Sequence, residues 1–346
     1  LNFITYTPAP PMPAINKTTI IILMLLNIEI FICVYFDVNI DMKLFLTGSS
    51  GFLGTAISKR LSDSYEIHHM QSDLKDHKAV EQELIEADPH LIIHFAARTE
   101  VQKSFTEQIE FSEINYIGTV NLIESALKLK NLKNFLFAST MEVYGWQPIS
   151  DEVKNNGVPK HFIAFDESTP TNPNCPYAVA KLGCENYLKY VSRSFDFPFT
   201  AIRQTNTYGR PRNEYFVTEQ IISQMLKNKN EIYLGYAEPY RNFMYVSDMI
   251  DMWCTLIEHN QKCIGKIFTI GPDQPIKIRD YANLIATKLD WKGKINWDSK
   301  DPRPGEIYWL CSNNKLITNT IGWEPKITLS DGLDKTIEIW KQKHNG

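Results

Sequence analysis

Short apolar runs alternate with longer amphipathic segments along the chain from residue 43 onward. Apolar runs of strand length lie at residues 43–47, 65–70, 91–95 and 135–138. Apolar residues recur with helical spacing in the segments between them, which predicts helices at residues 55–61, 77–87 and 112–129. Strands that alternate with helices predict an α/β fold, built on a doubly wound parallel sheet with helices on both faces. Ligands then belong at the carboxyl ends of the strands.

This regular alternation is lost beyond residue 145. Residues 146–176 are rich in Asn, Gly and Pro and predict a loop, followed by a helix at 177–194 and a strand at 198–203. The remaining elements are shorter and mixed: helices near 217–227, 247–258 and 278–290, a strand at 232–235 and a last helix from about residue 330. We interpret this part as a smaller C-terminal lobe that closes over the strand ends.

Three glycines follow the first strand at every third position, Gly48, Gly51 and Gly54, and enclose Phe52 and Leu53. The first two would let the backbone turn sharply and approach a pyrophosphate, whereas Gly54 would let the helix pack close to the sheet. A glycine triplet alone is a weak signal. The strand before it and the helix after it make it predict a dinucleotide-binding turn.

These features suggest how the chain is divided. We expect residues 42–209 to form mainly a dinucleotide-binding domain and residues 210–346 to form mainly a substrate-binding lobe, partly interleaved with the sheet. The hydrophobic content of 43% in 346 residues is ample for such a core.

Charge and cysteine usage exclude several kinds of protein. The net charge is −4, and no basic run is present, which argues against nucleic acid as a partner. The cysteines have no metal-ligand spacing, and their scatter predicts reduced thiols of a cytoplasmic protein rather than a disulfide framework; they stand at 33, 175, 184, 254, 263 and 311.

Residues 1–41 differ in kind from the rest. Residues 18–36 are almost wholly apolar and long enough to reach across most of a bilayer, which would make them a hydrophobic anchor or signal-like segment. Asn27 and Glu29 in the middle of this run argue against a membrane span. The alternative is an upstream translated extension, because Met42 stands one residue before the first strand.

Tyr177 and Lys181 are four residues apart in a predicted helix, so their side chains can reach the same site. A nearby ammonium group favours the phenolate, and we expect Lys181 to lower the pKa of Tyr177 far enough for it to act as a general base. Such a pair also occurs on many ordinary helix surfaces.

The sequence 138–145, Ala-Ser-Thr-Met-Glu-Val-Tyr-Gly, gives this pair more weight. A predicted strand ends at Ala138, which places Thr140 at the sheet edge where the glycine turn should hold its cofactor. Its hydroxyl can bond the substrate oxygen that Tyr177 deprotonates. Glu142 brings a carboxylate within reach of a different substrate atom.

At this point the chain resembles the extended short-chain dehydrogenases/reductases, and within them the nucleotide-sugar epimerase/dehydratase family. The matching motifs run in the family's order: Thr47-Gly48-x-x-Gly51-x-x-Gly54, Asp73-Leu74-x-Asp76, His94-Phe95-Ala96-Ala97, Asn115, Ser139-Thr140-x-Glu142-Val-Tyr-Gly145, Tyr177-x-x-x-Lys181, Arg203-x-x-Asn206-x-Tyr-Gly209, Arg241-Asn-Phe-x-Tyr-Val-x-Asp248, Arg303-Pro-Gly-Glu306 and Gly322-Trp-x-Pro325. Each motif is modest alone, but their joint order is specific.

The resemblance implies a Rossmann-type sheet and a role for each matched residue. Thr140 and Tyr177 would hold the sugar 4-hydroxyl, Tyr177 would take its proton, and Lys181 would bind the nicotinamide ribose. The nucleotide diphosphate side would be contacted by Asn206, Arg241 and Arg303, with Met141 also near the substrate. The cofactor-binding residues would be Gly48, Gly51, Phe52, Leu53, Gly54, Asp73, Leu74, Ala96, Ala97, Asn115, Tyr177 and Lys181.

The resemblance leaves the reaction open. Sugar-nucleotide 4,6-dehydratases have a similar Thr-x-Glu, in which the glutamate removes the C5 proton, and Glu142 fits that role. The dTDP-glucose branch has an aspartate between the two that protonates the leaving hydroxyl, but here that residue is Met141, which cannot donate a proton. Glu142 therefore acts as both base and acid, or the enzyme is a 4-epimerase or a UDP-glucuronate-type decarboxylase. An alternative of another class is a non-catalytic dinucleotide-binding protein.

The cofactor and partners follow from the same resemblance. We expect NAD, although the second strand ends near His68-His69-Met70-Gln71 without the usual acid, which leaves NADP possible with His69 or Gln71 near a 2′-phosphate. The expected partners are a nucleotide-diphosphate sugar and a second copy in a homodimer. Membrane association is expected only if residues 18–36 are a real anchor, and the expected location is the cytoplasm.

Overall fold

The computed structural model describes residues 42–156, 163–299 and 303–345. These residues belong to one compact unit, Asn39–Gly346. The expectations for residues 1–41, and the anchor at 18–36 in particular, lie outside the described part of the chain.

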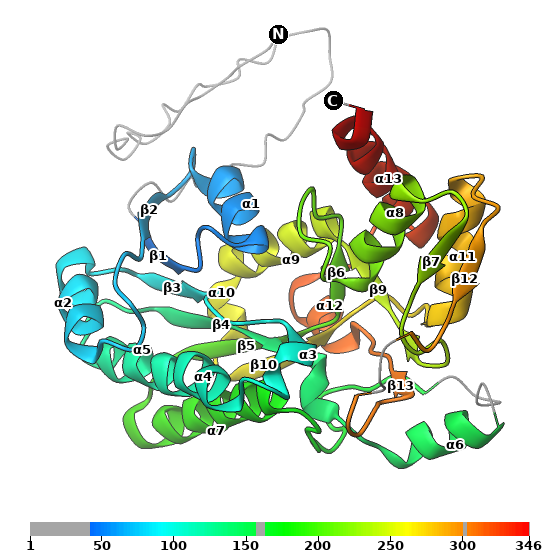
Figure 1. Cartoon of the computed structure of the whole chain (residues 1–346). Coiled ribbons are helices and arrows are strands. Elements are labelled where there is room, and N and C mark those ends of the chain that lie inside the picture. Colours follow the sequence, from blue (N-terminus) through cyan, green and yellow to red (C-terminus); the bar gives the residue numbers. More distant parts are fainter. Residues whose placement is uncertain (1–41, 157–162, 300–302, 346) are drawn as a thin grey trace, which may run out of the picture. The chain divides into compact units, whose positions relative to one another are not determined.

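The core of this unit is a six-stranded sheet in which every neighbouring pair is parallel. The strand order is β10-β5-β4-β3-β1-β2, so the order reverses beside β1 (Figure 1). The strands are β1 (Lys43–Thr47), β2 (Glu66–His69), β3 (Leu91–His94), β4 (Asn134–Thr140), β5 (Phe199–Gln204) and β10 (Lys266–Ile270). The predicted doubly wound parallel sheet is confirmed.

Alternating residues of β1 point to two different cores, as the period of two in a strand requires. Leu44 and Leu46 pack into a cluster with Ile57 and Trp253, whereas Phe45 packs into a second cluster with Leu188. Helices therefore cover both faces of the sheet. The first face is covered by α1 (Phe52–Leu61), α9 (Val246–Glu258) and α12 (Lys315–Ile321), and the second by α2 (His77–Ala87), α5 (Gly118–Ala126) and α7 (Pro176–Phe195) (Figure 1).

Two sequence expectations need correction. The helix expected at 112–129 is divided into α4 (Gln108–Ser112), a π-helical turn (Glu113–Ile117) and α5. Gly118 at this junction comes close to Leu74, since a Cβ there would lie 2.8 Å from the Leu74 side chain. The loop expected at 146–176 contains α6 (Pro148–Asn156), in which Ile149 and Val153 pack against Trp309.

The residues after 205 build a third core and several small sheets. Helices α8 (Val217–Lys227), α11 (Ile278–Lys288) and α13 (Leu329–Asn345) meet there around Tyr281 and Trp340. The small sheets pair β6 (Asn206–Tyr208) with β9 (Phe243–Tyr245), β7 (Glu231–Tyr233) with β12 (Lys294–Asn296), and β8 (Tyr240–Arg241) with β11 (Ile276–Lys277) and β13 (Trp309–Leu310). The short helices α3 (Val101–Ser104), η2 (Met141–Tyr144) and α10 (Asn260–Cys263) complete the described elements. Because β10 is a strand of the main sheet and α9 packs on that sheet, the C-terminal half interleaves with the first.

Cysteines, metal-binding groups and membrane-spanning helices among the described residues distinguish between classes of protein. The five cysteines within them are free thiols, and Cys33 lies outside. In this part of the chain, no group of His, Cys, Asp and Glu side chains is arranged to hold a metal ion. No described helix combines the length and apolar character needed to cross a bilayer.

Candidate active site

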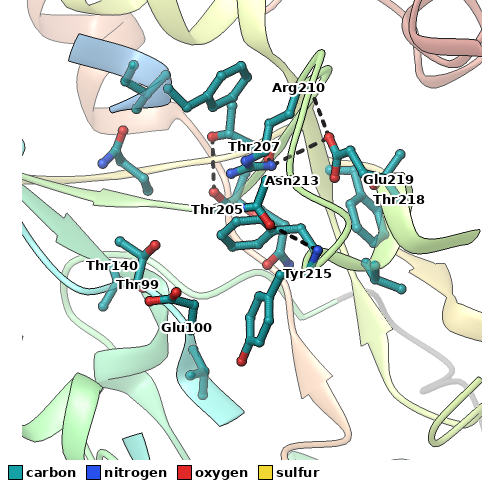
Figure 2. A pocket seen from close by; sticks show the side chains of 18 of the residues that line it. Thr99, Glu100, Thr140, Thr205, Thr207, Arg210, Asn213, Tyr215, Thr218 and Glu219 are labelled. Carbon is teal, nitrogen blue, oxygen red and sulfur yellow. Dashed lines mark hydrogen bonds and ion pairs between the residues drawn. The ribbon is translucent and has the colours of Figure 1, made fainter. Parts of the chain in front are cut away.

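A pocket of about 1460 Å³ opens at the carboxyl ends of the sheet strands, next to the reversal of strand order. One wall comes from the glycine turn, the end of β4 and the start of α7. The opposite wall comes from the segment 204–220 (Figure 2), from residues 234–236 after β7, from β8, and from the stretch around Arg303. The pocket lies where ligands bind in open α/β sheets.

The glycine turn has the geometry that the sequence predicts. Gly48 has a φ of +68°, and a Cβ there would lie 2.6 Å from the backbone nitrogen of Ala96, so only glycine fits. A Cβ on Gly54 would overlap the Gly48 carbonyl oxygen. These contacts press the start of α1 against the end of β1.

The N-terminus of α1 faces the pocket with its backbone N–H groups. Gly51 is the N-cap residue and makes no side-chain cap, and Phe52, Leu53 and Gly54 line the pocket after it. Unpaired N–H groups and the helix dipole make this end a site for an anion such as a pyrophosphate. The chain thus offers a cradle that fits a dinucleotide.

Thr140, Tyr177 and Lys181 form a buried wall of the same pocket, with exposed fractions of 7%, 8% and 2%. Thr140 ends β4, and the other two lie one turn apart in α7. The Lys181 ammonium donates a hydrogen bond of 2.8 Å to the carbonyl oxygen of Ala138, which ties α7 to the end of β4. Burial lowers the pKa of Lys181 to about 8.

The expected lowering of the Tyr177 pKa is wrong for this structure. Burial raises the pKa of Tyr177, and the negative charge of Glu142 adds to that rise, while a hydrogen bond with Thr140 opposes it. The Lys181 ammonium is turned to Ala138, so it does not offset the loss of solvation. Burial thus favours the protonated, neutral phenol, and Thr140 is its hydrogen-bond partner.

Glu142 and Met141 have opposite environments although they are adjacent. Glu142 is partly exposed and lines the pocket, and its backbone N–H donates to the Thr140 hydroxyl at 3.2 Å. The Met141 side chain is 2% exposed and packs into an apolar cluster with Tyr144 and Trp309. Glu142 is thus the acidic group beside Tyr177, whereas Met141 lines the pocket with an apolar, almost fully buried side chain.

A buried ion pair supports the wall from behind. Arg203 in β5 makes two-pronged contact with Glu185, with its NH2 group 2.7 Å from Oε2 and its Nε 3.1 Å from Oε1. Ser139 donates to Glu185 at 2.6 Å, and Arg203 donates to the Tyr144 hydroxyl at 3.0 Å. Because Glu185 lies one turn after Lys181, this network fixes α7 against β4 and β5.

Thr140 and Met141, two of the residues predicted to contact the substrate, lie at the end of β4, and the other three lie on the opposite wall. Asn206, Arg241 and Arg303 all line the pocket. Arg241 is 7% exposed and donates to Glu306 at 3.2 Å and to the Tyr240 carbonyl oxygen at 2.8 Å. Burial raises the pKa of Cys175, and the positive charge of Arg303 opposes that rise. Arg303 therefore lies near Cys175, the N-cap residue of α7.

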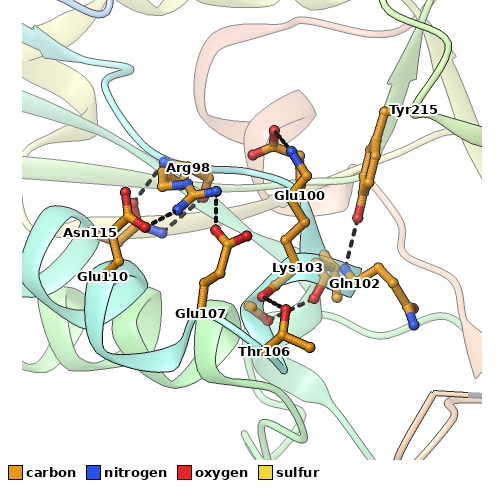
Figure 3. A network of polar contacts seen from close by, with 11 residues as sticks. Arg98, Glu100, Gln102, Lys103, Thr106, Glu107, Glu110, Asn115 and Tyr215 are labelled. Carbon is orange, nitrogen blue, oxygen red and sulfur yellow. Dashed lines mark hydrogen bonds and ion pairs between the residues drawn. The ribbon is translucent and has the colours of Figure 1, made fainter.

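Four predicted cofactor residues do not line this pocket: Asp73, Leu74, Ala96 and Asn115. The Asn115 side chain instead holds the backbone of Arg98, accepting at 2.8 Å and donating at 2.9 Å (Figure 3). His69 and Gln71 are also engaged locally, His69 with Ser58 at 2.7 Å and Gln71 with the His69 carbonyl oxygen. Their predicted roles therefore remain expectations.

The structure adds pocket residues that the sequence did not indicate. Glu100 follows β3 and enters the pocket beside Thr99, and Tyr215 accepts a hydrogen bond of 2.9 Å from the backbone N–H of Gln102 (Figures 2 and 3). Arg210 and Glu219 face each other on the opposite wall. These residues lie in loops or at helix starts, where no periodic pattern marks them.

Known proteins match this chain over most of its length. A family model described as GDP-mannose 4,6 dehydratase matches residues 45–336. The dTDP-D-glucose 4,6-dehydratase of Bos taurus is 28% identical over 292 residues, which cover 82% of this chain and 77% of that protein.

Solved structures share the fold. UDP-glucose 4-epimerase with UDP-glucose from Thermotoga maritima has a TM-score of 0.77 at 24% identity, covering 87% of this chain and 99% of that one. Pal from Bacillus thuringiensis has a TM-score of 0.77 at 28% identity, with the same coverage. Further structures of this fold are complexes with NAD or NADPH. Because the family model spans the glycine turn, the buried wall and most of the C-terminal half, the chain belongs to the GDP-mannose 4,6-dehydratase family of extended short-chain dehydrogenases/reductases.

Proposed function

We propose that this protein is an NAD(P)-dependent nucleotide-sugar enzyme that oxidises C4 of a nucleotide-diphosphate hexose and then eliminates water, as a 4,6-dehydratase does. One observation carries the proposal: the Thr140–Tyr177–Lys181 wall, the glycine turn and the Glu142 carboxylate line one pocket. Its site residues bring together a hydroxyl pair for the sugar, a cradle for the dinucleotide and a carboxylate for a second step.

Oxidation at C4 requires that the sugar hydroxyl lose a proton. A bound NAD(P)⁺ would supply the hydride acceptor and a positive charge beside the phenol. Thr140 and Tyr177 would orient the 4-hydroxyl, and Tyr177 would take its proton once nearby positive charge lowers the pKa that burial raises. Lys181, with a pKa of about 8, can relay that proton.

Elimination of water then falls to Glu142. A ketone at C4 makes the C5 proton acidic, and a carboxylate on the same face can remove it and give it to the leaving C6 hydroxyl. C6 would then regain the hydride lost from C4 and C5 would take a proton from solvent, so that the net change is loss of water. Met141 is buried among apolar side chains and takes no part in this proton transfer. We therefore assign both proton transfers of the elimination to Glu142.

Because Met141 cannot protonate a leaving hydroxyl, two other reactions also remain candidates. A 4-epimerase needs no carboxylate for elimination, and a decarboxylase of the UDP-glucuronate type loses carbon dioxide from the 4-keto intermediate. A non-catalytic dinucleotide-binding protein is the candidate of another class. The complete Thr140, Tyr177 and Lys181 set argues against it, since a sensor has no need of them.

The cofactor, oligomer and location are also part of the proposal. We favour NAD over NADP, because neither an arginine nor a lysine stands at residues 68–71. A homodimer would cover exposed apolar side chains on α4, the π-helical turn and α7, namely Ile109, Ile117, Val179 and Tyr190. Free thiols fit the cytoplasm, and any membrane association depends on residues 18–36.

One experiment separates the three reactions. The protein is incubated with UDP-, dTDP-, GDP- and CDP-hexoses and UDP-glucuronate in deuterated water, and product mass and stereochemistry are measured. Loss of water with deuterium at C5 supports the dehydratase. Loss of carbon dioxide identifies a decarboxylase, and an unchanged mass with inverted C4 identifies an epimerase. Dinucleotide binding without turnover of any sugar refutes the enzymatic proposal.

A further inference from the structure

Arg210 connects the glycine turn to the opposite wall of the pocket. It follows β6, and its guanidinium lies between two aromatic rings, 4.5 Å from the centroid of Phe52 and 3.8 Å from that of Phe216. Phe52 is the first residue of α1, and Phe216 is the N-cap residue of α8. The sandwich fixes the plane of the guanidinium without using its N–H donors.

The in-plane partners of Arg210 leave much of its hydrogen-bonding capacity unused. One terminal N–H donates to the Thr207 carbonyl oxygen, and the same nitrogen is 3.6 Å from Glu219 Oε1. That oxygen already accepts the backbone N–H groups of Gly209 and Arg210, at 3.1 and 3.0 Å. Glu219 Oε2 is buried without a hydrogen-bond partner, so the ion pair is loose and incomplete.

Arg210 is suited to the part of the pocket next to the glycine turn. The turn itself, residues 47–54, contains no lysine or arginine, so it offers only backbone N–H groups to an anion. Among the described cations that line the pocket, Lys181 is bonded to Ala138 and Arg241 to Glu306. Arg210 contacts the turn through Phe52, and its side chain is 14% exposed, toward the pocket (Figure 2).

We propose that Arg210 is a diphosphate-binding residue that grips the pyrophosphate of the dinucleotide from the wall opposite α1. The inference rests on the proposed function and deepens it, because it assigns a cofactor contact to the substrate-side half of the chain. A planar guanidinium pairs well with phosphate oxygens, and partial burial strengthens the bond. The same chemistry would also suit the diphosphate of the nucleotide sugar, and the contact with Phe52 favours the cofactor.

The test compares ligands with and without a diphosphate. Dissociation constants of NAD⁺, ADP-ribose and adenosine are measured by calorimetry for the wild type, Arg210→Met and the double variant Arg210→Met/Glu219→Gln, which does not leave the buried Glu219 unpaired. Loss of a charge-assisted contact should weaken NAD⁺ and ADP-ribose about 10- to 100-fold and change adenosine by less than about twofold. Arg210→Lys keeps the positive charge but not the planar pair of N–H donors, so its dissociation constants should lie between those of the wild type and of Arg210→Met.

Arg193→Met is the matched control, because Arg193 is an exposed arginine in α7 that does not line the pocket. It should leave all three constants within about twofold of the wild type. Equal losses for adenosine and NAD⁺ in the double variant would show that Arg210 only holds the walls together, and no loss at all would also overturn the assignment.

A second arm identifies the source of the diphosphate. If UDP, dTDP, GDP or CDP binding falls in the double variant while ADP-ribose binding is kept, Arg210 serves the nucleotide sugar and the cofactor assignment is wrong. These failures leave the proposed function intact, because the wild type still binds NAD⁺. A wild type that binds neither NAD⁺ nor NADP⁺ refutes the proposed function and this inference together.

Discussion

The cations on the two walls of the pocket differ in their partners and in how readily they lose a proton. On the buried wall, Lys181 has a backbone carbonyl oxygen as its hydrogen-bond acceptor, and burial lowers its pKa to about 8. On the opposite wall, Arg241 is paired with Glu306 and Arg210 with Glu219. Cations there remain charged at any ordinary pH, since guanidinium groups keep their protons in proteins.

This difference matches the work that each wall would do. Groups that exchange protons need a pKa close to the working pH, and burial with few charged partners produces it. Groups that hold a diphosphate need a permanent charge, and carboxylate partners keep such cations in place. We therefore expect changes on the buried wall to alter rates and changes on the opposite wall to alter affinities.

The largest effect is expected for Tyr177→Phe. Removal of the phenol hydroxyl takes away the proton acceptor for the 4-hydroxyl, and C4 oxidation should slow about 10³-fold. The absorbance of the reduced dinucleotide, recorded while the accepted nucleotide hexose is turned over, measures this step. NAD⁺ affinity should change little, and a variant that keeps full C4 oxidation would contradict the proposed mechanism.

Glu142→Gln should separate the two chemical steps. The amide cannot take the C5 proton, so water elimination and deuterium entry at C5 should fall about 10²-fold or more. Cofactor binding and reduction of the dinucleotide should persist. Glu100→Gln serves as the control carboxylate in the same pocket, and equal loss in both variants would remove the special role of Glu142.

Arg241→Met should act on affinity. Loss of a charged donor to the substrate diphosphate should raise KM about 10- to 50-fold and change kcat less than about threefold. Steady-state kinetics give both constants. Glu306→Gln keeps the arginine and removes only its partner, so its effect on KM should be clearly smaller, and a kcat defect in Arg241→Met would place this arginine with the catalytic groups.

The last prediction concerns stability rather than activity. Below about pH 8, Lys181 is protonated in both states, and burial penalises the folded state. Between about pH 8 and its ordinary pKa of 10.5, the folded side chain loses its proton while the unfolded chain keeps it. The free energy of unfolding should therefore rise with pH, by up to about 3 kcal/mol relative to Lys181→Met.

Denaturant unfolding of both proteins from about pH 7 to pH 10 measures that difference. A gap between wild type and variant that stays constant would show that Lys181 has an ordinary pKa. The buried wall would then resemble the opposite one, and the comparison of the two walls would fail.

Local patterns along the chain determined much of this molecule. Helix α2 has the bounds that its periodicity predicts, and α7 extends the predicted helix by one residue at each end. The glycine turn could be predicted from the sequence because only glycine tolerates the positive φ of Gly48 and the close approach of Ala96. Such features depend on neighbours in sequence. Helix α6 was missed because its polar, Pro- and Asn-containing sequence hides an apolar side that packs on Trp309.

The sequence by itself determined the order of strands and helices, the dinucleotide turn and the placement of Tyr177 and Lys181 on one helix. The tertiary structure decided what those groups can do. Burial reversed the expected shift in the pKa of Tyr177. The Lys181 ammonium donates a hydrogen bond to the carbonyl oxygen of Ala138, which is 43 residues away in the sequence. Likewise, Arg210 meets Phe52 only in the folded chain. Solvation and charge at a site are set by residues distant in sequence, so no local pattern reports them.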